Sequence, residues 1–204
     1  MGTATPGQIV ILNGVPRSGK SSIARALQER GPGVWVNLGV DASTSALPER
    51  FRPGIGFRPG GERPDLEDLV VTLYAALWES VAAHATLGLN VVVDVGMHDA
   101  YAAPRGIAHE AARRLEALPV LVVGVRCPVD VIWERRRTSW GQDVRDADDQ
   151  AVAAVERWQS AVHDPMDYDL EVDTSTLSPA QCADVIVARL SGPPGTSLAD
   201  AGIT

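Results

Sequence analysis

The stretch Ile9–Ser22, IVILNGVPRSGKSS, joins a run of aliphatic residues to a glycine-rich turn and to the start of a helical pattern. Residues 14–21 match G-x-x-x-x-G-K-[ST], and a strand before and a helix after the motif are the context that it requires. Glycines at both ends let the backbone curl, so that successive N–H groups and the positive end of the helix face one anion. The stretch therefore predicts a phosphate-binding loop (P-loop) that holds a nucleoside triphosphate, ATP or GTP.

The residue types in this loop predict particular contacts. Lys20 is the only lysine in the chain, and a compact ammonium suits a position between the β- and γ-phosphates. Ser21 offers a hydroxyl to Mg²⁺. An accidental glycine-rich turn is the alternative, and the flanking strand and helix count against it. The predicted nucleotide contacts in the loop are Gly14, Arg17, Ser18, Gly19, Lys20, Ser21 and Ser22.

Short runs of β-branched residues alternate with amphipathic segments along the rest of the chain. Strand followed by helix, repeated, is typical of a parallel sheet covered on both faces. We predict an α/β protein with the P-loop NTPase fold: a five-stranded parallel sheet with helices on both faces and a lid segment. The expected strands lie at 8–13, 34–40, 90–95, 120–125 and 169–174, and the expected helices at 21–29, 65–86, 101–117, 129–137, 149–162 and 178–190.

Two irregular stretches interrupt this pattern within what we expect to be a single domain, residues 1–191. Residues 42–64 form a long segment rich in Pro, Gly and Arg, and a loop of that length inside a compact domain is usually functional. Residues 135–150 mix arginines with carboxylates and are expected to form the lid. Residues 192–204 are rich in Gly, Pro and small side chains, which predicts a disordered tail.

Composition argues against several classes of function. A formal net charge of −8 disfavours non-specific binding to nucleic acid. The two cysteines, Cys127 and Cys182, lack a metal-binding spacing and suit a reducing compartment. No basic segment followed by an apolar one opens the sequence, and the longest apolar run, 120–125, is too short to span a bilayer. We therefore expect a cytoplasmic protein with neither a nucleic-acid nor a membrane partner.

Two carboxylates follow predicted strands and are candidates for chemistry. In parallel sheets ligands collect at the carboxyl ends of the strands. Asp94 ends one strand and is predicted to hold Mg²⁺ together with Ser21, whereas a turn or helix-capping role is the alternative. Asp41 follows another strand and opens the 42–64 segment, so it can accept the proton of an attacking hydroxyl. An N-cap or turn role is again the alternative for Asp41.

Arginines gather at the predicted lid. In a phosphotransferase they would close over the nucleotide and neutralise charge that develops during transfer. Arg136 is predicted to be catalytic, together with Asp41 and Lys20, whereas Arg135 and Arg137 are predicted to bind the nucleotide. A solvated helix end is the alternative for each arginine taken singly.

Taken together, the motifs resemble those of the chloramphenicol phosphotransferase family, small kinases with an adenylate-kinase-like fold. The resemblance extends to about Arg189 and includes "ILNGVPRSGKSS", "LGVDAS", "ALPERFRPGIGF", "VLVVGVRCP" and "VHDPMDYDLEVDTS". In that family the acid of "GVD" is the proposed base, which implies this role for Asp41. The resemblance likewise implies that Lys20 and Ser21 hold phosphate and Mg²⁺, that Asp94 assists the metal, and that the lid arginines lie within 135–145.

These observations predict an O-phosphotransferase that moves the γ-phosphoryl group of ATP or GTP to a small-molecule hydroxyl. The resemblance implies that the acceptor is an antibiotic, which phosphorylation would inactivate. A metabolic kinase of the shikimate or gluconate type is the nearest alternative. A non-catalytic nucleotide switch is a further alternative, although guanine-reading Asn-Lys-x-Asp cannot occur in a chain whose single lysine is Lys20. The sequence leaves the oligomeric state open.

Overall fold

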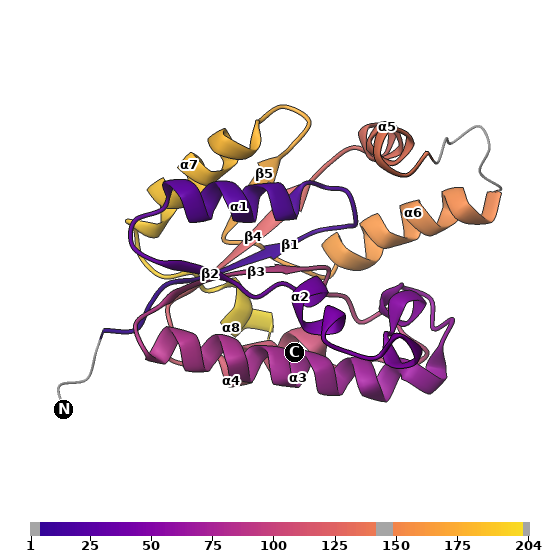
Figure 1. The fold of residues 1–204 in the computed structure, drawn as a ribbon, viewed down its shortest axis with the longest axis horizontal. Coiled ribbons are helices and arrows are strands. Elements are labelled where there is room, and N and C mark those ends of the chain that lie inside the picture. Colours follow the sequence, from indigo (N-terminus) through magenta and orange to yellow (C-terminus); the bar gives the residue numbers. More distant parts are fainter. Residues whose placement is uncertain (1–4, 142–148, 202–204) are drawn as a thin grey trace.

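The computed structural model describes residues 5–141 and 149–201 of the 204-residue chain. Five strands and eight α-helices alternate along these residues, together with two short 3₁₀ helices, η1 and η2 (Figure 1). The strands are β1 (Ile9–Asn13), β2 (Trp35–Asn37), β3 (Asn90–Val95), β4 (Val120–Arg126) and β5 (Leu170–Asp173). The helices are α1 (Lys20–Arg30), α2 (Val40–Ser45), η1 (Glu49–Phe51), η2 (Gly54–Phe57), α3 (Pro64–Thr86), α4 (Ile107–Arg114), α5 (Val129–Trp140), α6 (Asp149–His163), α7 (Pro179–Leu190) and α8 (Ser197–Ala201).

The strands form one parallel sheet in the order β2-β3-β1-β4-β5. Strand β1 lies at its centre, where Ile11 pairs with Val93 of β3 and with Val122 of β4. Every residue of β1 is buried, which explains why its sequence is a continuous apolar run rather than an alternating one. Because all strands run in the same direction, their carboxyl ends meet at one edge of the sheet.

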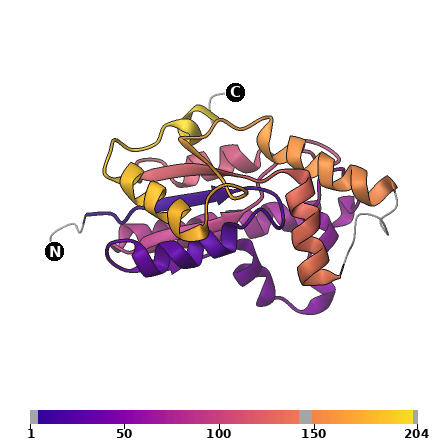
Figure 2. The same cartoon turned by 90° about the horizontal axis from the view of Figure 1, so that it is seen from above.

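Helices cover both faces of the sheet, as the sequence predicted. Helices α1 and α7 pack together on one face, and α3, α4 and α8 lie on the other (Figure 1). One core cluster fills each face, with Trp78 and Tyr74 of α3 in the larger cluster and Leu27 of α1 with Ile186 of α7 in the other. Helices α5 and α6 project beyond the carboxyl edge of the sheet, and this projection is clear in Figure 2. The fold is therefore the predicted P-loop NTPase architecture.

Helix α3 is long and apolar enough, by length and composition, to cross a membrane. In this fold it serves as a core helix instead. Val70, Leu77, Trp78 and Val81 are buried against the sheet, and its N-terminal turn carries Asp65 and other acidic residues. The apolar character of α3 is thus explained by packing within the protein.

The prediction of a disordered tail from residue 192 was wrong for residues 197–201. These residues form α8, whose first turn is capped by Asp169 at the start of β5. The Asp169 carboxylate accepts hydrogen bonds from the backbone N–H groups of Thr196 and Ser197 at 2.7 and 3.0 Å. Leu198 is buried against the larger core cluster. One long-range carboxylate and one buried leucine therefore order a segment whose own composition favours disorder.

Candidate active site

The P-loop leaves the central strand at Asn13 and enters α1 at Lys20. Gly14 sits where a Cβ would lie only 2.7 Å from the Val125 carbonyl oxygen, so no larger residue fits without displacing β4. Gly19 has φ 100°, and Arg17 also adopts a left-handed conformation, with φ 71°. Such a left-handed residue before a helix turns successive N–H groups toward one side, which is the geometry of an anion cradle. Close packing and backbone conformation both explain the glycine spacing of the motif.

Lys20 is held inside this cradle. Its Nζ donates to the Val15 carbonyl oxygen at 2.9 Å and lies 3.7 Å from Oδ1 of Asp94. Burial lowers the pKa of Lys20, while the charges of Asp94 and Asp41 act in the opposite direction. The ammonium is therefore desolvated and held by neighbours that a phosphate group can replace.

Ser21 and Asp94 face each other across the sheet edge. The Ser21 hydroxyl donates to Oδ2 of Asp94 at 2.5 Å, although 73 residues separate them in the sequence. A hydroxyl and a carboxylate so close together fit the oxygen preference of Mg²⁺, which keeps several waters and phosphate oxygens as further ligands. Within 5–141 and 149–201, no group of three or more His, Cys, Asp or Glu side chains could hold a metal by itself. The donor set thus suits a metal that arrives with a nucleotide.

Asp41 lies in the first turn of α2 rather than at the end of a strand. The β2–α2 connection passes close to β3, and a Cβ on Gly39 would lie 3.0 Å from the Asp94 Cβ. Asp41 is exposed and lines the same cavity as Lys20 and Asp94. The structure therefore brings together the three charged residues that the sequence assigned to the P-loop, the metal and the base.

Arg135 joins the P-loop to the turn after β5. Its Nη1 donates to the Arg17 carbonyl oxygen at 3.1 Å and to the Thr174 hydroxyl at 2.9 Å, and its Nη2 donates to the Thr174 carbonyl oxygen at 2.7 Å. The Thr174 hydroxyl in turn donates to the Ser18 carbonyl oxygen at 2.6 Å. Arg135 lines the cavity and fixes the shape of the P-loop from outside.

The other two predicted lid arginines lie in different places. Arg136 lines the cavity, with its guanidinium 5.1 Å from the centre of the Trp133 ring. Arg137 points elsewhere: its guanidinium pairs with Glu134 at 2.5 Å, one turn away, and it does not line the cavity. The structure therefore brings Arg135 and Arg136, but not Arg137, to the other predicted residues. The predicted lid is described only in part, because residues 142–148 lie outside the described residues.

Ser18 does not reach the cavity either. Its side chain is fully buried, and its Oγ lies where a Cβ on Gly14 would be 2.9 Å away. The remaining predicted loop residues, Gly14, Arg17, Gly19 and Ser22, do line the cavity. Ser18 therefore contributes to the structure of the P-loop through its backbone, because its carbonyl oxygen accepts a hydrogen bond from the Thr174 hydroxyl.

The cavity has a volume of about 1520 Å³ and lies along the carboxyl edge of the sheet. That volume exceeds the size of a typical single-ligand pocket, so it has room for two substrates. Sequence analysis missed several of its lining residues. The length of the 42–64 segment was the signal that could have found Arg58 and Phe57. The missed lining residues include Arg52, Phe57, Arg58, Tyr74, Trp133, Trp158, Thr174 and Leu177.

A buried polar network lies behind the P-loop. Asn13 accepts from the Met97 backbone N–H at 2.7 Å and donates to the Tyr168 hydroxyl at 3.2 Å, and His163 contacts the same hydroxyl at 2.8 Å. Burial lowers the pKa of His163 to about 4 and raises the pKa of Tyr168 to about 12, so both side chains are neutral near pH 7. The network ties the end of α6 to β1 without adding charge.

Solved structures share this fold at low sequence identity. A tunicamycin resistance protein from Deinococcus radiodurans is 21% identical, with a TM-score of 0.61, over 93% of this chain and 98% of that chain. A gluconokinase from Sinorhizobium meliloti is 20% identical, with a TM-score of 0.63, over 92% and 93% of the two chains. The APS kinase of Mycobacterium tuberculosis is 18% identical, with a TM-score of 0.60, over 92% and 99%. A search of curated protein sequences gave no match.

The sequence itself matches one protein family. Residues 7–191 match the family described as chloramphenicol phosphotransferase-like protein, so the match extends over the sheet, the P-loop and helices α1–α7. Its extent and the geometry of the P-loop agree with a kinase that acts on a small molecule. The chain belongs to the chloramphenicol phosphotransferase-like family.

Proposed function

We propose that this protein is an O-phosphotransferase that moves the γ-phosphoryl group of ATP or GTP to a hydroxyl group of an antibiotic and thereby inactivates it. The observation that supports this most directly is the common cavity of Asp41, Lys20 and the Ser21–Asp94 pair. A phosphate cradle, a pair of metal ligands and an exposed carboxylate that lines the same cavity are the parts that such a transfer requires.

Asp41 is the residue that handles the proton. Its exposed carboxylate accepts the hydroxyl proton of the acceptor as the acceptor oxygen bonds to the γ-phosphorus. The bond from the γ-phosphorus to the bridging oxygen breaks, and the electron pair leaves with the nucleoside diphosphate. Asp41 is placed for this role by the first turn of α2.

Lys20 and the arginines hold the transferred group. Lys20 would exchange its bond to the Val15 carbonyl oxygen for phosphate oxygens, and Arg136 would neutralise charge from the lid side. Ser21 and Asp94 would hold Mg²⁺, which supplies charge stabilisation at the phosphates. Arg135 keeps the loop in shape through the Arg17 carbonyl oxygen.

The antibiotic acceptor and the cytoplasmic location are supported by less direct observations. The family is named after chloramphenicol phosphotransferase, and one protein of the same fold is a tunicamycin resistance protein. Cys127 and Cys182 are both buried and unpaired, which supports a reducing compartment. We propose no nucleic-acid or membrane partner.

A metabolic kinase is the second candidate, and one observation favours it. The cavity is lined by Lys20 and five arginines, more cationic side chains than a neutral acceptor and a nucleotide require. Gluconokinase and shikimate kinase share the fold, although that likeness concerns the fold alone.

Mass spectrometry tests the proposal. The protein is incubated with Mg²⁺, with ATP or GTP, and with a panel of hydroxylated antibiotics and hydroxylated metabolites, and products heavier by one phosphoryl group are sought. Asp41→Asn serves as the matched control, because it preserves the cradle and removes the base. A phosphorylated antibiotic that is absent with Asp41→Asn supports the proposal. Phosphorylation of metabolites alone supports the second candidate, and nucleotide binding without any transfer contradicts both.

A further inference from the structure

The cavity carries a strong local excess of positive charge. Lys20 and five arginines line it, whereas Asp41 and Asp94 are the carboxylates that line it among the described residues. The chain as a whole has a formal net charge of −8, so this local excess is opposite in sign to the charge of the chain. The lining arginines are Arg17, Arg52, Arg58, Arg135 and Arg136.

Lys20, Arg135 and Arg52 each have a structural role in the protein itself. Lys20 binds the Val15 carbonyl oxygen and lies near Asp94, and Arg135 binds Thr174. Arg52 donates to the carbonyl oxygens of Leu47 at 3.0 Å and Ser45 at 3.3 Å, so it holds the turn after α2. These contacts explain why three cations are present without an acceptor.

Arg58 is different, because it comes from the 42–64 segment and not from the P-loop or the lid. It is exposed, and it makes no hydrogen bond or ion pair with the residues that the structure describes. It lies close enough to Arg136 that its charge, after the effect of burial, lowers the pKa of Arg136, as does the charge of Arg17. Arg136 is thus repelled by the charges of two arginines from other segments, and an anion bound near it and Arg58 would relieve that repulsion.

The backbone around Arg58 is fixed from both sides. His98 accepts at Nδ1 from the Ala100 backbone N–H at 3.2 Å, which leaves Nε2–H to donate to the Phe57 carbonyl oxygen at 2.9 Å. The Gly60 backbone N–H donates to the Ala100 carbonyl oxygen at 2.7 Å. Arg58 therefore projects from a segment that is anchored immediately before and after it.

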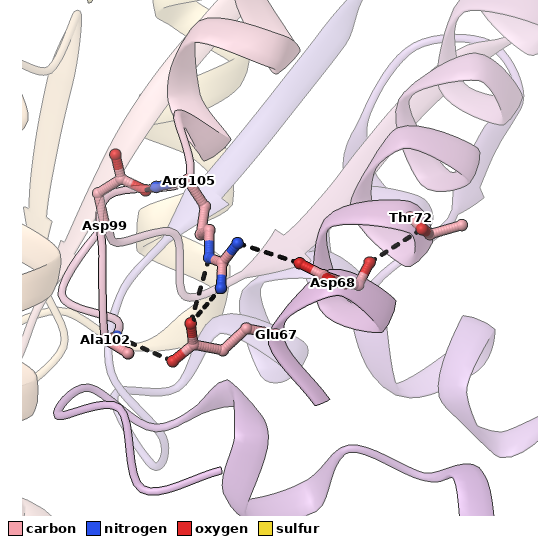
Figure 3. Close-up of polar contacts among 6 residues, drawn as sticks. All are labelled: Glu67, Asp68, Thr72, Asp99, Ala102 and Arg105. Atoms are coloured by element: carbon pink, nitrogen blue, oxygen red, sulfur yellow. Dashed lines mark hydrogen bonds and ion pairs between the residues drawn. The ribbon is translucent and has the colours of Figure 1, made fainter. Parts of the chain in front are cut away.

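The segment that provides these anchors is itself clamped to α3 (Figure 3). Glu67 is buried and accepts from the Ala102 backbone N–H at 2.8 Å and from Arg105 at 2.7 Å, and Arg105 also pairs with Asp68 at 3.0 Å. Asp99 accepts from the Arg105 backbone N–H at 2.8 Å. Hydrogen bonds thus connect the segment that carries Arg58 to residues 98–105, and these residues to the buried Glu67 of α3. Such support pre-organises a binding side chain before its ligand arrives.

An aromatic wall stands beside this cation. Phe57 meets Tyr74 edge to face, with ring centres 6.0 Å apart at 90°, and Trp158 lines the cavity from α6. Burial, and then the charge of Asp94, raise the pKa of Tyr74, so its hydroxyl keeps its proton and can donate a hydrogen bond. This wall suits the flat or ring-shaped body of a small molecule.

We propose that the acceptor is an anion: a hydroxylated, ring-bearing small molecule whose carboxylate or phosphate group binds Arg58 while its ring packs on Phe57 and Trp158. The inference rests on the proposed phosphotransfer and narrows its acceptor class. Arg58 is a binding residue in this scheme.

Fragment binding tests the inference without knowledge of the true acceptor. The P-loop is first saturated with Mg²⁺ and a non-hydrolysable ATP analogue, so that a fragment cannot occupy the phosphate cradle. Binding of 4-hydroxybenzoate and of its neutral partner 4-hydroxybenzamide is then measured by NMR titration. The variants are Arg58→Ala and, as the control, Arg50→Ala, which removes an exposed arginine of the same segment that stacks on Phe51 outside the cavity.

We expect the carboxylate to bind the wild-type protein roughly tenfold more tightly than the amide, because a charge-assisted hydrogen bond to arginine is lost in the amide. This preference should fall to within about twofold in Arg58→Ala and persist in Arg50→Ala, with nucleotide affinity equal in all three proteins. Equal binding of the two fragments, or no binding of either at the solubility limit, overturns the inference. A loss of nucleotide affinity in Arg58→Ala also overturns it, because Arg58 would then serve the nucleotide. Absence of phosphoryl transfer to any hydroxyl, with the fragment preference intact, would contradict the proposed function and leave the anion site standing.

Discussion

Replacement of Asp41 by Asn separates a catalytic role from a structural one. Asp41 is exposed in the first turn of the six-residue helix α2, and its carboxylate makes no hydrogen bond or ion pair with the described part of the chain. Its contribution to folding is therefore limited to a favourable charge at a helix N-terminus, about 0.3–1 kcal/mol. That amount lowers the melting temperature of a 200-residue domain by no more than about 4 °C. Loss of a general base, in contrast, lowers kcat by about 10²- to 10⁴-fold.

The assay compares kcat, the nucleotide Kd and the melting temperature of the wild-type protein, Asp41→Asn and Glu49→Gln. Glu49 is an exposed carboxylate in η1 of the same segment, and it does not line the cavity, so its variant controls for the loss of one surface charge. We expect the nucleotide Kd of Asp41→Asn to change by less than about fivefold, because Asp41 is exposed and its charge acts on Lys20 less strongly than the charge of Asp94 does. A kcat close to that of Glu49→Gln, or a fall in kcat matched by unfolding, would refute the assignment of Asp41 as the base.

Further predictions concern the cradle, the metal and the buried histidine. Lys20→Ala should raise the nucleotide Kd roughly 10- to 150-fold, the equivalent of one charge-assisted hydrogen bond, and an unchanged Kd by calorimetry would contradict the cradle. Ser21→Ala should raise the Mg²⁺ concentration needed for half-maximal transfer by about 10–100-fold, measured at saturating nucleotide, and an unaltered Mg²⁺ curve would exclude Ser21 as a ligand. The folded-state pKa of His163 is lowered to about 4, so the unfolded chain binds a proton there first as the pH falls below 6.5. The free energy of unfolding should therefore decrease between pH 6.5 and about 4, by about 1–2 kcal/mol after screening, and chemical denaturation of His163→Gln should show a flatter pH dependence.

The sheet and the P-loop could be predicted because their signals are local. The aliphatic run of β1 and the spacing from Gly14 to Ser21 are each contained in a few consecutive residues. The Ser21–Asp94 contact was also accessible, because parallel strands bring their carboxyl ends to one edge. These parts depend on rules that need no knowledge of the tertiary structure.

Other parts depend on contacts that the sequence does not display. Successive helix positions differ by about 100° in direction, so the three consecutive arginines 135–137 cannot all face one cavity, and only tertiary packing decides which do. Arg58 acquires its place because its neighbours Phe57 and Gly60 hydrogen-bond to His98 and to the Ala100 carbonyl oxygen, about 40 residues away. Helix α8 depends on Asp169 in the same way. Each of these outcomes is set by a partner distant in sequence.

The single lysine also makes this protein a spectroscopic reporter of its own site. Selective ¹⁵N labelling of lysine would place one backbone amide signal, and one side-chain amine, at the mouth of the phosphate cradle. No assignment of other resonances is then needed to follow nucleotide binding, because every ¹⁵N signal of the labelled protein belongs to Lys20. Departure of Nζ from the Val15 carbonyl oxygen would appear as a shift of that one amine. Amine-directed reagents have equally few targets, since the chain offers them this buried side chain and its N-terminus.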